Sequence, residues 1–271
     1  MGVRTPSYQA GFYAPERGGR AAYPQLWRGC VGAWNPGLGP SGLVLRDWSG
    51  YGNHCGITRA PSAPVPSEIW TPRNGRWSLE FADSSANAGY FASCTIPAII
   101  MNDTFTLSAW VYQRSSPGGH FPSFIYIVEP VSGRSITLQN TRNSEVAFTD
   151  SVVQNVTWPS ALSLNIFRHF AVSVTNKTAT FYVDGKVSTT ATLVAPTWSA
   201  STRTLHLGCR PNFGTFDGWM QDYRMYNRAS TGNEISLLAR RPGIAYELAP
   251  RKFISLPPSS ARLRRILTGA T

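Results

Sequence analysis

One segment near the middle of the chain, residues 168–186, constrains the fold more than any other. In its first half, from Phe170 to Val174, every second residue is a large apolar one, which is the period of a strand with one buried face. Asn176-Lys177 predicts a tight turn, the alternation then resumes, and Asp184-Gly185 predicts a second turn. A single hairpin is marginally stable in water. The segment therefore belongs to a larger sheet.

Short strand patterns separated by turn residues recur on both sides of this hairpin. The 20 Pro and 24 Gly residues leave room for one short helix, near Thr231–Arg240. Further strands are expected at Trp77–Phe81, Gly89–Cys94, Thr104–Tyr112, Phe124–Val128, Ser135–Gln139, Glu145–Thr149, Thr204–Gly208 and Gly218–Tyr226. Residues 60–75 are rich in Pro and Ser and are expected to form a loop. The expected core includes Phe105, Leu107, Val111, Phe170, Val172, Val174, Phe181 and Val183. This pattern predicts an all-β fold, a two-sheet antiparallel sandwich or jelly roll over residues 26–238.

The net charge of +11 lies mainly at the two ends of the chain. Residues 1–25 and 239–271 are rich in Pro, carry most of the excess Arg, and are interpreted as extended arms. Basic arms bind acidic surfaces, either of nucleic acid or of protein. Apolar residues stand between the arginines, so we favour protein partners over nucleic acid. The arm residues expected to make these contacts are Tyr8, Phe12, Tyr13, Arg240, Arg241, Tyr246, Arg251, Lys252, Arg262, Arg264 and Arg265.

The four cysteines, Cys30, Cys55, Cys94 and Cys209, are widely spaced and form no CxxC pair. We expect four reduced, mostly buried thiols. The chain begins without the apolar core of a signal peptide, and no run approaches the length of a membrane span. These features predict synthesis in a cytoplasm and no contact with a membrane.

Four segments resemble, in the right order, the motifs of laminin-G-like domains of the concanavalin A-like superfamily. Residues 47–53 are similar to the D-x-S-G-x-G-N loop of those domains, and residues 105–111 to their FTLSAWV strand. The central hairpin resembles their strand pair that ends in Y-V-D-G, and residues 218–229 resemble their closing strand. The chain departs from the pattern at Cys55, Met220 and Phe167. The resemblance covers most of residues 30–240 and implies a concanavalin A-like jelly roll.

Residues 240–247 and 262–267 resemble the ends of laminin-G-like proteins encoded by tailed bacteriophages. This resemblance implies a non-enzymatic structural protein of a phage virion, a decoration or fibre-like protein on the capsid or tail. Such a protein would be attached through its arms to other virion proteins, including copies of itself. A glycan-binding module that recognises a host surface is the first alternative. A concanavalin A-like glycoside hydrolase is the second.

The acidic residues argue against hydrolysis. A glycosidase needs two carboxylates that face one cleft. On one strand these would stand two or four residues apart, and none of the 14 acidic residues has such a neighbour. His169 and His206 fall on expected strands, without a nucleophile motif beside them. We therefore expect no catalytic residues, although a carboxylate pair supplied by two strands stays open.

Asp47 is the candidate metal ligand. Related domains often bind Ca²⁺ near this loop, and Asp47, Asn53 and Asp222 offer oxygen ligands of the type that Ca²⁺ takes. The alternative is that Asp47 caps its own turn through backbone hydrogen bonds. We favour the cap, because one pair of carboxylates provides few ligands for a calcium site. We expect no cofactor.

Aromatic residues in expected loops are the remaining candidates. Nine Trp and 11 Tyr exceed the need of one sandwich core. Trp158, Trp198 and Phe213 stand beside Pro, Ser and Asn, so we assign them to loops. Such rings stack on sugars or anchor a protein interface. The sequence leaves both roles open.

Overall fold

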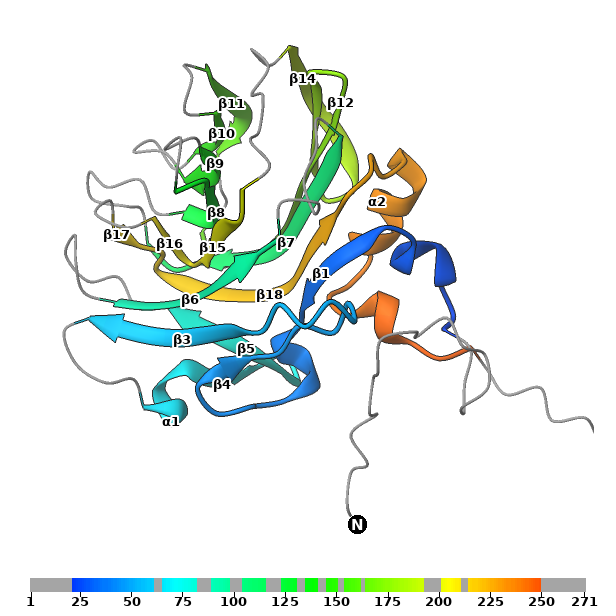
Figure 1. Cartoon of the computed structure of the whole chain (residues 1–271). Helices are drawn as coiled ribbons and strands as arrows, with labels where there is room; N and C mark the ends of the chain where they lie inside the picture. Colours follow the sequence, from blue (N-terminus) through cyan, green and yellow to red (C-terminus); the bar gives the residue numbers. More distant parts are fainter. Residues whose placement is uncertain are drawn as a thin grey trace, which may run out of the picture.

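Two antiparallel sheets packed face to face form the body of the protein (Figure 1). The structure is a computed structural model that describes residues 21–60, 65–81, 89–97, 104–115, 123–130, 135–140, 145–150, 154–161, 164–192, 201–210 and 214–249. The predicted all-β sandwich is confirmed. None of the helices in these ranges has the length and apolar composition required to cross a membrane.

The front sheet has the strand order β14-β13-β12-β7-β18-β5-β4, with β1 paired to β18. The central hairpin supplies β12 and β13, and β7 and β18 lie at the centre of the sheet. The bounds are β1 (Cys30–Trp34), β4 (Trp70–Arg73), β5 (Arg76–Phe81), β7 (Phe105–Gln113), β12 (Phe167–Thr175), β13 (Thr178–Val183), β14 (Lys186–Thr192) and β18 (Gly218–Tyr226).

The back sheet has the strand order β11-β10-β9-β8-β15-β6-β3-β2. The bounds are β2 (Val44–Leu45), β3 (Cys55–Ala60), β6 (Gly89–Ile96), β8 (Ser123–Val128), β9 (Ser135–Asn140), β10 (Glu145–Asp150), β11 (Gln154–Ala161) and β15 (Arg203–Leu207). A separate short pair is formed by β16 (Cys209–Arg210) and β17 (Gly214–Thr215).

The main core lies between the two sheets. Seven of the eight predicted core side chains are buried in it, and Val183 packs against it from a half-buried position. Both turns of the central hairpin have the left-handed backbone expected of them, with φ of 47° at Asn176 and 78° at Gly185. Alternation along the strand thus identified the buried face correctly.

Three segments differ from the prediction. Residues 60–75 were expected to form a loop, but they contain α1 (Pro66–Ile69) and β4. The chain after Gly185 continues as β14, which the sequence interpretation left out. Trp158 was assigned to a loop but belongs to β11, because its segment pairs with β10 along most of its length. In each case pairing with a neighbouring strand decides the structure of a segment with weak local preference.

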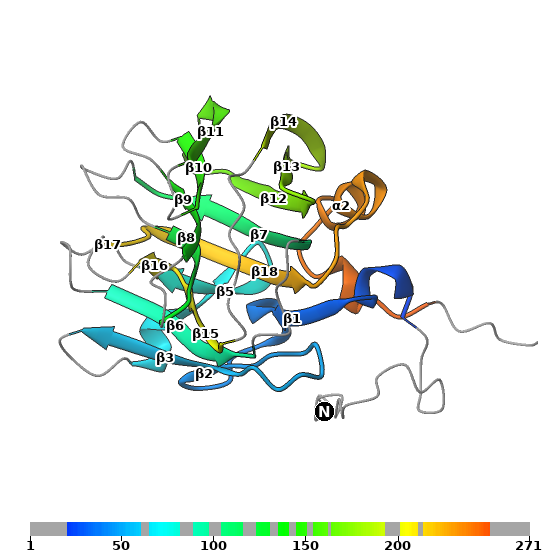
Figure 2. The same cartoon turned by 45° about the horizontal axis from the view of Figure 1, so that its top comes forward.

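The outer face of the front sheet is covered along part of its area. α2 (Gly232–Leu238) packs Ile235 against Ala171 and Tyr182 of the sheet. Beside it lie β1, η1 (Pro24–Trp27) and η4 (Ile244–Tyr246), which close a second apolar cluster around Tyr226. Figure 2 shows α2 beside β12 and β13. η2 (Pro36–Leu38) follows β1 and contacts β5 and β18.

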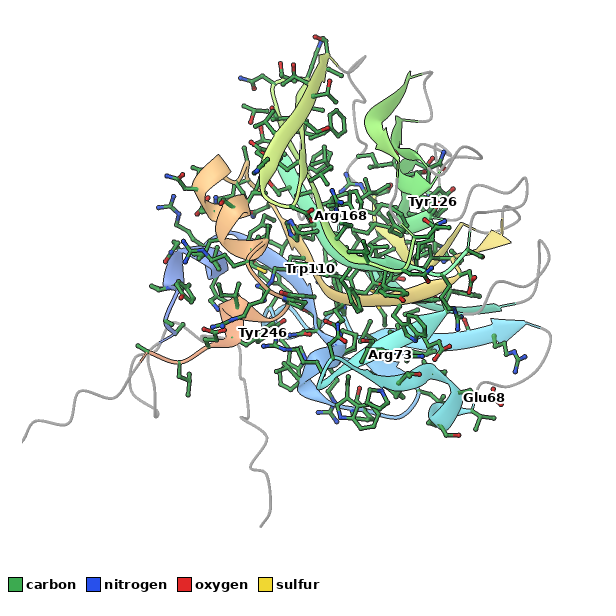
Figure 3. The ribbon with its side chains drawn as sticks, turned by 180° about the vertical axis from the view of Figure 1, so that it is seen from behind. Glu68, Arg73, Trp110, Tyr126, Arg168 and Tyr246 are labelled. Atoms are coloured by element: carbon green, nitrogen blue, oxygen red, sulfur yellow. The ribbon has the colours of Figure 1, made fainter. Side chains whose placement is uncertain are left out.

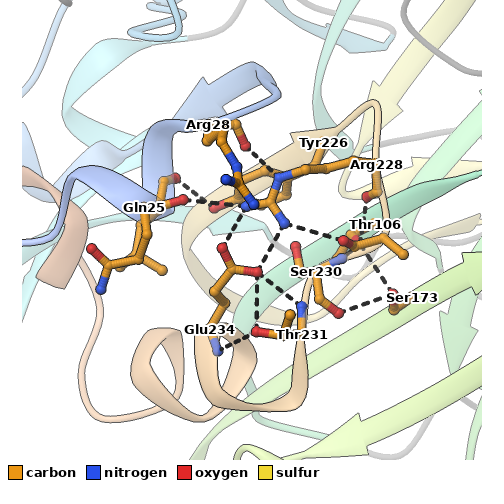
Figure 4. Close-up of polar contacts among 11 residues, drawn as sticks. Gln25, Arg28, Thr106, Ser173, Tyr226, Arg228, Ser230, Thr231 and Glu234 are labelled. Atoms are coloured by element: carbon orange, nitrogen blue, oxygen red, sulfur yellow. Dashed lines mark hydrogen bonds and ion pairs between the residues drawn. The ribbon is translucent and has the colours of Figure 1, made fainter.

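Arg228 joins this covering layer to both ends of the domain (Figure 4). Its guanidinium binds both oxygens of Glu234 at 2.7–2.8 Å and donates to the carbonyls of Gln25 and Arg28. Glu234 also completes a capping box with Thr231, which begins α2 as the sequence predicted. The start of the domain and its last helix are thereby fixed to one another.

The packed part of the chain extends beyond the predicted boundaries of 26 and 238. Ala21 pairs with Leu248 in a β-bridge, and Ile244 and Ala245 are buried. Tyr246, expected in an extended arm that contacts partner chains, packs edge-on against Trp27 with ring centroids 5.1 Å apart. These apolar residues complete the second cluster, so the chain does not leave the domain at 238.

Of the other predicted arm residues, Arg241 pairs with Glu247 at 2.6 Å and Arg240 is exposed on the surface. The remaining ones lie outside the described residues: Tyr8, Phe12, Tyr13, Arg251, Lys252, Arg262, Arg264 and Arg265.

Candidate functional site

Asp47 caps the loop between β2 and β3. Its Oδ1 accepts from the backbone N–H groups of Ala33 and Ser49, each at 2.9 Å. Its Oδ2 accepts from the Ser49 hydroxyl at 2.8 Å and from the Asn53 N–H at 2.9 Å. A carboxylate offers about four acceptor positions, and all of them are used here. Asp47 therefore acts as a structural cap.

The side chains of Asn53 and Asp222 also have hydrogen-bond partners within the protein. The Asn53 side chain donates to the carbonyl of Val31 at 3.1 Å. Asp222 accepts from the Arg224 Nε at 2.9 Å and from the Gly243 N–H at 2.8 Å. In the described ranges no group of three or more His, Cys, Asp or Glu is placed to hold a metal ion. The carboxylates of Asp47 and Asp222 are thus both bound by donors of the protein itself.

The predicted aromatic contacts lie outside what the structure describes. Trp198 and Phe213 fall outside the described residues, and for Trp158 the backbone alone is described. Those three positions stay predictions. The described aromatic residues offer a different surface, on the front sheet beyond the area that α2 covers.

This surface begins at the tip of the β4–β5 hairpin. Asn74-Gly75 forms its two-residue turn, and both residues have left-handed φ, 50° and 73°. An Asn-Gly turn of this type twists as the flanking strands do. Arg73 and Arg76 are directly opposite one another across the turn, which places two guanidinium groups at one end of the sheet.

A row of aromatic side chains crosses the front sheet next to this hairpin. The strand register sets Phe167 of β12 opposite Tyr112 of β7, and Tyr112 opposite Trp219 of β18. Ring centroids are 5.1 Å apart in the first pair and 4.8 Å apart in the second. Phe167 and Tyr112 each stand two residues from a side chain of the covered area, so the row lies on the same outer face. We call these three residues the aromatic row.

A pocket of about 170 Å³ lies between the hairpin tip and the aromatic row. Its lining residues are Arg73, Asn74, Arg76, Phe167, Gln221 and Pro242. Arg73 lies over the Trp219 ring at 3.8 Å, and the Arg76 guanidinium donates to the carbonyl of Pro242. The lining contains two cations and no carboxylate. Figure 3 labels Arg73 at this end of the sheet and Tyr246 in the covered area.

Two carboxylates stand at the other side of Trp219, and Arg114 binds both of them. Its guanidinium lies 2.6 Å from Glu80 and 2.8 Å from Asp217. Burial raises the pKa of Glu80, but hydrogen bonds from Thr71 and the charge of Arg114 outweigh it and hold that pKa below its usual value. Glu80 is thus ionised at neutral pH, and it has no proton to give to a leaving group.

The sequence interpretation missed both the pocket and this carboxylate pair. Asn-Gly between Arg73 and Arg76 is a strong hairpin signal, but the surrounding prolines favoured a loop. Glu80 and Asp217 are separated by more than a hundred residues, so no spacing rule along a strand could pair them.

Solved structures with a similar fold include carbohydrate-active proteins and a toxin. Domain 4 of AbnA, an extracellular arabinanase of Geobacillus stearothermophilus, matches with TM-score 0.58 and 16% identity over 78% of this chain and 98% of that one. The sialidase of Trypanosoma rangeli matches with TM-score 0.57 and 15% identity over 78% of this chain. Botulinum neurotoxin type C matches with TM-score 0.58 and 14% identity over 80% of this chain.

At such identities the likeness concerns the fold. The match spans 32% of the sialidase chain and 52% of the toxin chain. No curated protein sequence matches the chain. The sequence model Laminin_G_3, described as the concanavalin A-like lectin/glucanases superfamily, matches residues 86–236. This match covers more than half of the 271 residues, and the chain belongs to the concanavalin A-like lectin/glucanase superfamily.

Proposed function

We propose that this protein is a non-catalytic glycan-binding domain and that its ligand is an acidic polysaccharide. The observation that carries the proposal is the pocket between the hairpin tip and the aromatic row, because it joins Arg73 and Arg76 to an aromatic wall at Phe167. The fold is compatible with it: similar structures include a complex with arabinotriose and a toxin whose cell entry depends on two ganglioside molecules.

The charges of the pocket select an anionic group. Arg73 and Arg76 face each other as like charges, which destabilises a strand pair unless an anion lies between them. Neither forms an ion pair with a carboxylate among the described residues. Guanidinium groups bind carboxylate and sulfate through paired hydrogen bonds. A uronic acid or a sulfated sugar presents such a group.

The aromatic row would hold the sugar ring next to that anion. Phe167 belongs to both the pocket and the row, and it is half-buried. Ile166 beside it is 53% exposed and Leu164 is 39% exposed, so the apolar surface continues outward from the ring. The C–H faces of sugars pack on aromatic and aliphatic surfaces of this kind. A ligand would thus meet an apolar wall and two cations at once.

The absence of catalysis is part of the proposal. Glu80 and Asp217 are the two carboxylates beside the row, and both form ion pairs with Arg114. A glycosidase needs one of its two acids protonated, whereas the pKa of Glu80 is lowered. Incubation of the protein with the polysaccharide that it binds should release no reducing sugar. Release that disappears in Glu80→Gln would overturn this part.

Binding can be tested with the full chain against a panel of neutral, carboxylated and sulfated polysaccharides. We expect the acidic members to bind, and Arg76→Gln and Arg73→Gln each to lower the affinity about tenfold, which is the loss of one charge-assisted contact. Phe167→Ala should lower it for the whole sugar but not for inorganic sulfate. Arg59→Gln is the matched control, because Arg59 is a partly exposed arginine of the back sheet.

Other outcomes would contradict the proposal in distinct ways. Equal binding of neutral and acidic glycans would remove the role of the arginines. Binding of single-stranded nucleic acid at an affinity above that of every glycan would assign the pocket to phosphate. Equal losses in Arg59→Gln and Arg76→Gln would mean that the general positive charge of the chain attracts the ligand.

We further propose, as a second function compatible with the first, that the domain is a structural protein of a phage virion attached through its ends to other virion proteins. The charge distribution favours it: residues 1–20 and 250–271, which the structure does not describe, hold eight of the 25 Lys and Arg residues and a single acidic one. Basic ends of this kind bind acidic surfaces of neighbouring chains.

Electron microscopy and protein mass spectrometry of the native particle test this second proposal. The chain should be present in stoichiometric copies on the capsid or tail, with density for its ends against neighbouring subunits. A particle without the chain, or with ends that contact no neighbour, would reject it while leaving the glycan proposal intact.

A further inference from the structure

Two of the four cysteines are brought together by the back sheet. β3 and β6 are antiparallel neighbours, and their register pairs Gly56 with Ser93. One step along the ladder, Cys55 therefore stands directly opposite Cys94, although the two are 39 residues apart in sequence. Directly opposed residues on antiparallel strands have Cα atoms about 4.5–5.5 Å apart, which lies within the range of disulfides.

The side chains converge as well as the backbones. The two Sγ atoms are 2.6 Å apart. Cys55 is fully buried, whereas Cys94 is half-buried and packs against the edge of the core. Cys30 is different, because its thiol donates to the carbonyl of Gly32. Of the described thiols, then, Cys55 and Cys94 lie close enough for a small displacement to bring their sulfur atoms to the disulfide bond length of about 2.05 Å.

We propose that Cys55 and Cys94 form a reversible disulfide that joins β3 to β6. This replaces the expectation of four reduced thiols for that pair. The bond would close the chain segment 55–94, which carries α1 and the whole β4–β5 hairpin with Arg73 and Arg76. The cross-link would thus hold the segment that bears the pocket to the back sheet.

Thiol–disulfide exchange with a small-molecule disulfide such as oxidised glutathione supplies the oxidant. The Cys94 thiolate, the more accessible of the two, attacks one sulfur of glutathione disulfide and releases one glutathione thiolate. The Cys55 thiol then loses its proton and attacks the Cys94 sulfur, which releases the second glutathione. Two protein thiols are oxidised and one external disulfide is reduced to two thiols. Burial raises the pKa of Cys55, which assigns it the second step.

The test uses the full chain, first reduced, then desalted and equilibrated with graded ratios of oxidised to reduced glutathione. Free thiols are counted after unfolding, and peptides are mapped by mass spectrometry. We expect the count to fall from four to two, with one cross-linked peptide pair that contains Cys55 and Cys94. The Tm should rise by about 5–10 °C in the oxidised form and return on reduction.

Controls separate a specific bond from general oxidation. Cys30→Ser should still lose two thiols, whereas Cys94→Ser should keep all three of its own and show no rise in Tm. Four free thiols in the oxidised, folded protein would overturn the proposal. So would a stable glutathione adduct at Cys94, or a bond to Cys30 or Cys209. Because the peptide map is made on the unaltered chain, the result does not depend on whether the variants fold.

Discussion

The outer face of the front sheet holds two arginine clusters that differ in burial. At one end of β18, Arg224 lies beneath the covering layer, over the rings of Trp27 and Tyr246 at 4.9 and 4.7 Å. At the other end, Arg73 lies over Trp219 at 3.8 Å. Arg224 and its partner Asp222 have side chains 0% and 1% exposed, whereas Arg73 is exposed at the hairpin tip.

The difference shows that burial distinguishes an arginine with a structural role from arginines that are available to bind a ligand. A buried cation requires a fixed counter-charge, since desolvation of an unpaired charge is costly. Burial lowers the pKa of Arg224, but the carboxylate of Asp222 outweighs it, and the pKa is raised well above its usual value. A bulge in β18 with left-handed Asp222 aligns the two groups. Arg73 and Arg76 form no ion pair with a carboxylate among the described residues, so an anionic ligand can supply the counter-charge.

The largest effect is expected at the buried cluster. Arg224→Ala should destabilise the protein by about 3–5 kcal/mol, because Asp222 would keep an unpaired buried charge. Urea unfolding measures it. The double variant Asp222→Asn, Arg224→Met should recover part of the loss, since both charges are then absent. A cost below about 1 kcal/mol for Arg224→Ala would mean that the pair is hydrated and that the two clusters do not differ.

His169 lies under the same layer and should make stability depend on pH. It is 1% exposed, and burial, followed by the charge of Arg224, lowers its pKa to about 3. An unfolded histidine titrates near 6.5. Between these values the unfolded state binds more protons, so stability falls as the pH falls from about 6.5 towards 3.

Replacing His169 tests the predicted direction of this pH dependence. His169→Phe should flatten the dependence of the unfolding free energy on pH by about 1.4 kcal/mol per pH unit in that window, the contribution of one proton. His206, whose pKa burial also lowers, contributes to the same dependence from the back sheet, so His169→Phe should leave part of the slope in place. An unchanged slope in His169→Phe would show that the histidine is protonated in the folded protein.

Substitutions of Arg73 and Arg76 should leave stability almost unchanged, in contrast to Arg224→Ala. Arg73→Gln and Arg76→Gln should change the unfolding free energy by less than about 1 kcal/mol, because each removes one of two like charges that face each other. Their effect should appear in ligand affinity. A loss of stability comparable to that of Arg224→Ala would assign Arg76, through its bond to Pro242, to the scaffold.

Calcium should have the smallest effect. All four acceptor positions of Asp47 are filled by protein donors, so millimolar Ca²⁺ should leave Tm unchanged. Asp47→Ala should lower Tm equally with and without Ca²⁺. A rise in Tm with Ca²⁺ that Asp47→Ala abolishes would instead support the alternative of a calcium site at Asp47.

Much of the scaffold follows from local pattern. Alternation around Val172 and turn residues at Asp184-Gly185 each act within a few residues, so they identified the central hairpin. The loop motif at residues 47–53 indicated the superfamily, which the family match confirms. The hydrogen bonds of Asp47 lie mostly within that motif, and the cap was therefore foreseeable.

The site depended on contacts that no local pattern encodes. The aromatic row joins Phe167, Tyr112 and Trp219 from three strands, and Arg114 brings Glu80 to Asp217 across the sheet. Cys55 meets Cys94 because β3 and β6 are neighbours in register. Sequence alone determined which residues alternate and where the chain turns, since these are short-range preferences. Strand order and register are set by burial of the whole core, so tertiary structure alone decided which distant side chains meet.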